Sequence, residues 1–171
     1  YDNIIYWQVE NEVFLTGFSR SNCGALDLEF LQKEIDLVRS LDSRPVLITD
    51  SGEFGTWYGA YKAGDVFGTS IYLYVWPRSV GFPIRYPITP GFFRLKHNII
   101  NLLAGAKPSI VIEMSMEPWL LQPIVDTPLD VQLQRMGIDK FNKMITFSSK
   151  TGFDTFYLWG AEWWYWLSMN G

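Results

Sequence analysis

The chain has 171 residues, and its 48% hydrophobic and 19% charged residues are typical of a folded globular protein rather than a disordered one. The formal net charge is −4 and no basic patch could follow a phosphate backbone, so we expect no nucleic-acid partner. No apolar run is long enough to span a membrane. Cys23 and His97 are the only residues of their types, so we expect no intrachain disulfide, no metal site and no cofactor.

Apolar runs alternate along the chain with segments of helical periodicity. The apolar runs predict β-strands at residues 3–9, 45–49, 66–72, 109–114 and 153–158. Helical spacing, together with start and stop signals, predicts helices at residues 26–41, 56–63, 91–104 and 127–148. The proline-rich segment 75–90 is expected to form a long loop.

This alternation predicts an α/β protein with a parallel sheet, because parallel strands need crossover connections. The strands are apolar throughout, which suits either an open sheet covered on both faces or a barrel. No glycine-rich phosphate loop follows a strand, and polar residues gather just after the strand ends, which favours a barrel. A full (β/α)8 barrel has eight strands and roughly 250 residues. We therefore expect a partial (β/α)8 TIM barrel in which residues 1–171 supply strands four to eight of one catalytic domain, truncated at both ends.

Two glutamates follow predicted strands at positions where barrel enzymes carry catalytic groups. Glu12 comes just after the first strand, and Glu113 closes the fourth. Glycoside hydrolysis uses two carboxyl groups, one to protonate the leaving oxygen and one to attack the anomeric carbon or activate a water. A glutamate at a strand end is also often just a solvated carboxylate, so the spacing alone is a weak signal.

The neighbouring residues make the pattern more specific. The segment WQVENE, which ends in Asn11 and Glu12, resembles the strand-four signature of clan A glycoside hydrolases, which include many cellulases, mannanases and β-galactosidases. The resemblance implies that Glu12 is the acid/base and that Asn11 binds the sugar 2-hydroxyl. It also implies that Glu113 is the nucleophile, that Tyr72 hydrogen-bonds it, and that Trp159 forms the floor of the cleavage subsite.

Other residues carry alternatives. Glu117 is a rival nucleophile to Glu113 and otherwise a substrate contact, while Trp119 either stacks on a sugar or packs in the core. Glu162 either binds sugar hydroxyls or caps the next helix. Some clan members carry a histidine where this chain has Ser70, which puts cellulase-like recognition in doubt. The loop with Asp50 and Glu53 is expected to be a turn and helix start, with substrate contact as the less favoured reading.

Three hypotheses follow. The first is a retaining β-glycosidase that acts on an oligosaccharide or polysaccharide by double displacement. The second is a catalytically silent carbohydrate-binding protein, suggested by an aromatic content of 17%. The third is an inactive half-barrel fragment that self-associates through exposed barrel edges. The sequence indicates neither the sugar, the linkage nor the cellular location.

Overall fold

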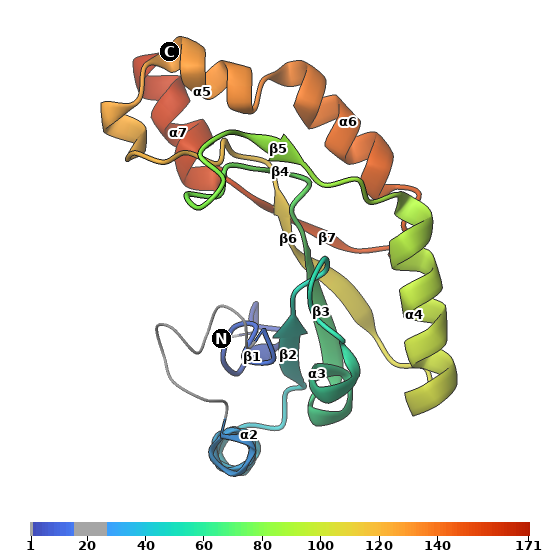
Figure 1. Ribbon diagram of the computed structural model, residues 1–171. Helices are drawn as coiled ribbons and strands as arrows, with labels where there is room; N and C mark the ends of the chain where they lie inside the picture. Colours follow the sequence, from blue (N-terminus) through green and yellow to red (C-terminus); the bar gives the residue numbers. More distant parts are fainter. Residues whose placement is uncertain (1, 16–26) are drawn as a thin grey trace.

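The computed structural model describes residues 2–15 and 27–171, which form a mixed α/β fold built on one parallel sheet (Figure 1). The strands lie in the order β1 (Trp7–Gln8), β2 (Val46–Asp50), β3 (Val66–Ile71), β6 (Ser109–Ser115) and β7 (Phe156–Trp159). Each strand pairs in parallel with its neighbour, and the sheet curls into about half a barrel. The predicted α/β class and the parallel order of the five strands are confirmed.

Among the described residues, six α-helices connect or follow these strands: α2 (Leu28–Leu41), α3 (Tyr58–Ala63), α4 (Pro90–Ala104), α5 (Leu129–Arg135), α6 (Ile138–Ser148) and α7 (Ala161–Asn170). In Figure 1 the helices α2, α3, α4 and α6 lie on the convex side of the sheet. Within the described part of the chain, no helix has the length and apolar character needed to cross a membrane.

Side chains that alternate across the strands create two apolar layers. The larger core lies between the sheet and the helices and includes Ile48, Phe67 and Met114 from the strands. A smaller cluster on the concave face contains Leu47, Val66 and Ile110. Because neighbouring residues of a strand point to opposite faces, runs such as VLITD are buried on both sides.

Several expectations about individual elements were wrong. Of the strands expected at 3–9 and 153–158, the structure has only Trp7–Gln8 and Phe156–Trp159 as strand. The helix expected at 127–148 is interrupted between α5 and α6, where Gly137 is extended and a Cβ at this residue would lie 2.7 Å from the carbonyl oxygen of Leu133. The segment 75–90 is not entirely loop, because Tyr74–Val75 (β4) and Ile84–Arg85 (β5) form a short antiparallel hairpin. Residue 26, the expected start of the first helix, lies outside the described residues.

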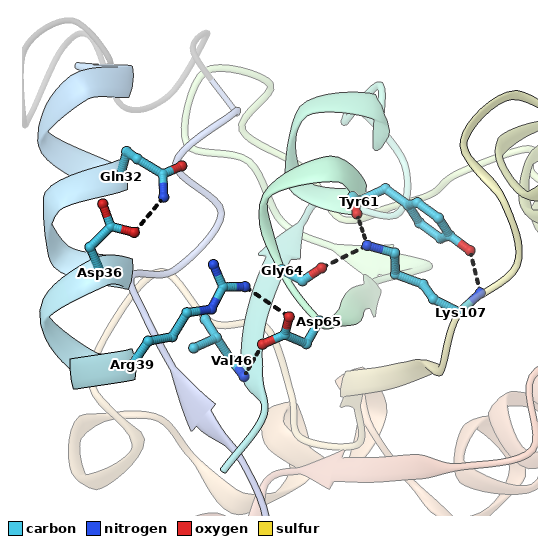
Figure 2. A network of polar contacts seen from close by, with 8 residues as sticks. All are labelled: Gln32, Asp36, Arg39, Val46, Tyr61, Gly64, Asp65 and Lys107. Atoms are coloured by element: carbon cyan, nitrogen blue, oxygen red, sulfur yellow. Dashed lines mark hydrogen bonds and ion pairs between the residues drawn. The ribbon is translucent and has the colours of Figure 1, made fainter. Parts of the chain in front are cut away.

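A polar network ties together the amino ends of three strands (Figure 2). Asp65, just before β3, accepts a hydrogen bond from the backbone N–H of Val46 at 3.0 Å and forms an ion pair with Arg39 of α2 at 2.8 Å. Lys107, just before β6, donates to the carbonyl oxygens of Tyr61 and Gly64 in and after α3. These contacts fix β2, β3 and β6 at the edge opposite to the strand ends where the candidate acids lie.

The core predicts a large stability loss on truncation. Phe67 of β3 is fully buried and contacts the rings of Trp57 and Tyr61 at centroid distances of 5.2 and 5.4 Å. We expect Phe67→Ala to lower the free energy of unfolding by about 3–5 kcal/mol, because it removes buried contacts and leaves a cavity. The control Leu102→Ala, on α4 and 86% exposed, should change it by less than about 0.5 kcal/mol in the same urea titration. Equal losses in both variants would contradict this description of the core.

Candidate active site

Glu12 is held by contacts from two neighbouring strands. Its backbone N–H donates to the hydroxyl of Thr49 on β2 at 3.0 Å, and its carboxylate Oε1 accepts from the hydroxyl of Ser70 on β3 at 2.7 Å. Glu12 has a φ of 50°, a left-handed conformation that is uncommon for residues other than glycine. Such strain persists only where the surroundings impose it, and it occurs preferentially at functional sites.

A β-bulge in β6 directs Glu113 toward the same place. Consecutive residues of β3 pair with Val111 and Glu113, so Ile112 is an extra residue in β6. Val111 and Met114 both belong to the core on the convex side. Because regular alternation from Val111 would point Glu113 into that core, the bulge is what places its carboxylate on the concave side.

The hydroxyl of Tyr72 orients this second carboxylate. Tyr72 lies directly after β3, and its hydroxyl donates to Oε2 of Glu113 at 2.8 Å. Burial raises the pKa of Tyr72 well above its ordinary value, and the negative charge of Glu113 raises this pKa further. The phenol therefore stays protonated and acts as the donor in this hydrogen bond to Glu113.

The environment of Glu12 favours its protonated form. Burial raises the pKa of Glu12, the hydrogen bond from Ser70 lowers it, and the charges of Glu113 and Asp50 raise it again, so that the pKa lies above its ordinary value. Ser70 also pairs with Glu113 in the sheet, which places this one residue between the two acids. A raised pKa suits a carboxyl group that has to donate a proton to a leaving group.

Both acids line a cleft of about 610 Å³, a volume within the usual range of ligand sites. The cleft also contains a third acid, Glu53, and a set of aromatic side chains: Phe54, Tyr72, Trp76, Tyr86 and Trp119. Carboxylates surrounded by aromatic faces suit a ligand that has hydroxyl groups and apolar C–H faces.

No protein-family model matches this chain, and no curated protein matches it. What the site can do chemically is therefore inferred from its own geometry.

Glu117, Trp119 and Trp159 lie at a second cavity of about 500 Å³. The indole N–H of Trp159 donates to Oε1 of Glu117 at 3.0 Å. Trp119 and Tyr72 line both cavities, and their rings meet edge to face with centroids 5.5 Å apart. The two cavities therefore adjoin, with Glu113 in the first and its rival Glu117 in the second.

The remaining two candidates line neither of these cavities. Asn11 is exposed, and its side-chain oxygen accepts hydrogen bonds from Gln8 at 3.1 Å and from Thr49 at 3.3 Å. Glu162 is exposed in the first turn of α7, and its charge contributes to raising the pKa of Glu117. The side chain of Asn11 thus supports the loop that carries Glu12, and Glu162 lies close to the second cavity.

Sequence reasoning gave too little weight to Glu53 and Ser70. Glu53 is a cleft residue whose Oε1 accepts from the backbone N–H of Tyr72 at 2.7 Å. Burial raises the pKa of Glu53 to about 7. Its place after the carboxyl end of β2, at the same edge of the sheet as Glu12 and Glu113, was the signal that could have identified it.

The raised pKa of Glu53 predicts a pH-dependent stability. The folded state holds this proton more tightly than the unfolded state, whose pKa is near 4.5, so its contribution to stability is present at low pH and is lost as the pH rises toward 8. Replacing it by Gln, which keeps an acceptor for the Tyr72 N–H, should remove this loss. Between pH 5 and 8 the free energy of unfolding of the wild type should fall by roughly 2 kcal/mol more than that of Glu53→Gln.

Urea titrations at both pH values measure this difference. Glu29→Gln is the matched control, because the side chain of Glu29 on α2 is 80% exposed. The control should follow the wild type, and identical pH dependence in all three proteins would contradict the burial of Glu53.

Proposed function

We propose that this chain forms the catalytic site of a retaining glycoside hydrolase that cleaves a β-linked oligosaccharide or polysaccharide. The position of Ser70 is the observation that carries the proposal. It donates a hydrogen bond to Glu12 and is the sheet partner of Glu113, so the two carboxyl groups face one cleft from neighbouring positions. Closely spaced carboxyl groups favour retention, because inversion needs room for a water between them. The β-configuration of the substrate is carried over from the resemblance of WQVENE to clan A enzymes.

The reaction proceeds in two displacements. In the first, a carboxylate oxygen of Glu113 forms a bond to the anomeric carbon while the bond to the leaving oxygen breaks and Glu12 gives that oxygen its proton. In the second, Glu12 removes a proton from a water, whose oxygen attacks the same carbon and releases Glu113. The charges support this division, since Glu12 has the raised pKa and Glu113 accepts the hydrogen bond from Tyr72.

The proposed fold is a (β/α)8 TIM barrel, of which the curled sheet would be strands four to eight. Two features support it. First, the strands follow one another in chain order and are joined by segments that contain helices. Second, the acids lie at the carboxyl ends of the strands, where barrel enzymes place their catalytic groups. Trp119 and Trp159, 44% and 47% exposed, offer ring faces for sugars beside the cleavage point.

Replacement of Glu113 and replacement of Glu12 in the intact protein should impair different steps of the reaction. Glu113→Gln should lower kcat for aryl β-glycosides at least about 10³-fold, because no glycosyl-enzyme can form. Glu12→Ala should still release a good leaving group such as dinitrophenol in one burst and then stall, because the second step lacks its base. Azide, a nucleophile that needs no base, should restore turnover of Glu12→Ala and give a β-glycosyl azide.

Product analysis by NMR distinguishes the alternatives. Glu117→Gln is the matched comparison and should keep the wild-type kcat within about tenfold. A loss of turnover in Glu117→Gln but not in Glu113→Gln would exchange the roles of these two acids, and an α-configured first product would replace retention by inversion.

A carbohydrate-binding protein without catalysis is the second candidate, favoured by the exposed indoles of Trp119 and Trp159. It predicts that the wild type binds oligosaccharides and hydrolyses none of the aryl glycosides. The acids in the cleft argue against it, because a protein that only binds sugar does not need to hold Glu12, Glu53 and Glu113 together against their mutual repulsion.

We further propose that the chain self-associates through the sheet. Among the described strands, β1 and β7 are each paired on one side only, and unpaired strand edges recruit other strands. Sedimentation velocity between about 1 and 100 µM should show a weight-average mass that rises with concentration. Leu158→Lys, which places a charge on β7, should reduce this rise, and a wild type that stays monomeric throughout the range would refute the proposal.

A further inference from the structure

A small cavity of about 240 Å³ adjoins the catalytic cleft on the side of the β4–β5 hairpin. Its lining includes Tyr74, Arg85, Arg135 and Lys140. Val75 and Trp119 line both this cavity and the cleft, so the two are neighbours. The volume is below the range of about 300–1,000 Å³ for whole-ligand sites, so it suits one sugar residue or one substituent of a longer glycan.

All three charged residues that line this cavity are cations, and each comes from a different element. Arg85 lies on β5, Arg135 ends α5, and Lys140 belongs to α6. Among the described residues, none of the three forms an ion pair with a carboxylate. The chain as a whole has a net charge of −4, so three cations without a carboxylate partner around one cavity are a local excess of positive charge. A negatively charged ligand would neutralise this excess.

Aromatic rings and backbone carbonyls hold two of these cations in place. The guanidinium of Arg135 lies over the ring of Trp76 at 4.4 Å, and the ammonium of Lys140 lies 5.1 Å from the ring centre of Tyr74. Lys140 also donates to the carbonyl oxygens of Gln134 at 2.8 Å and Arg135 at 3.1 Å. The two cations repel each other: burial lowers the pKa of Lys140, and the charge of Arg135 lowers it further. Groups fixed in this way against repulsion are ready to bind an anion without further ordering.

The neighbouring cleft limits where a negative group of the substrate can lie. Glu12, Glu53 and Glu113 would repel an anionic substituent on the sugar that is cleaved. A substituent on the next sugar could instead reach the arginines, whose planar donors match the paired oxygens of a carboxylate or sulfate. Trp119, shared by both cavities, offers a ring face to the sugar that connects them.

We infer that Arg85, Arg135 and Lys140 form a cationic subsite that binds an oxyanion group, a carboxylate or a sulfate ester, on the sugar residue next to the one at the cleavage point. The substrate would then be an acidic glycan rather than a neutral one. This inference rests on the proposed glycosidase function, because that function defines the cleavage point to which the subsite is adjacent. The binding of the anion itself does not require catalysis.

The test compares three matched ligands by saturation-transfer NMR titration of the intact protein: methyl β-glucoside, its 6-sulfate and methyl β-glucuronide. At least one anionic ligand should bind at least tenfold more tightly than the neutral one at low salt, and this preference should shrink as salt is added. The anion that binds more tightly identifies which oxyanion the subsite takes. Equal binding of all three, or no binding of either anion, would overturn the inference.

Variants locate the binding. Arg135→Gln and Lys140→Gln should each reduce the preference for the anion about tenfold. Arg85→Gln, at the exposed residue of β5, should reduce it as well and carries the least risk to folding. Lys33→Gln on α2 is the matched control, because the Lys33 side chain is exposed. Figure 1 shows α2 far from the β4–β5 hairpin. A preference that survives all three subsite variants would place the anion elsewhere and refute the inference. Failure of hydrolysis with an intact preference would refute only the proposed enzyme.

Discussion

The β3–β6 pairing skips one residue of β6, and the whole candidate site depends on that skip. The extra residue, Ile112, changes the alternation of the strand so that Glu113 faces the concave side while Val111 and Met114 both stay in the core with the helices. Without the bulge, the carboxylate would point into an apolar layer, where an unpaired charge is very costly. With it, Glu113 lies beside Ser70 and within reach of the Tyr72 hydroxyl, so one local irregularity joins the apolar packing of the fold to the chemistry of the cleft.

The cleft keeps three carboxyl groups together by giving each its own donor. Glu12 accepts from the hydroxyl of Ser70, Glu113 from the phenol of Tyr72, and Glu53 from the backbone N–H of the same tyrosine. These donors come from one short segment at the end of β3, so a single strand end organises all three acids. Burial raises the pKa of Glu12 and of Glu53, and a raised pKa is the condition for a carboxyl group to act as an acid.

Much of the fold could be predicted because burial on both faces of a sheet leaves continuous apolar runs, and five of these became strands. The carboxyl ends of those strands also located Glu12 and Glu113. The sequence does not predict the bulge, because Ile112 lies in a continuous apolar run, and such a run shows the same pattern with or without an extra residue. The role of Ser70 and the burial of Glu53 depend on contacts between strands, which no local pattern encodes. The break before α6 was not predicted, because a helix usually tolerates a single glycine, such as Gly137, within a periodic segment.

The polar network at the amino ends of β2, β3 and β6 has an evolutionary consequence. Asp65, Arg39 and Lys107 hold the strands together at the edge that carries no candidate catalytic group. Loops at the other edge can therefore lengthen, shorten or change sequence without disturbing these contacts. A change of ligand preference and retention of the scaffold therefore do not interfere with each other. A protein engineer could graft new loops onto the carboxyl-terminal rim while leaving the opposite rim untouched.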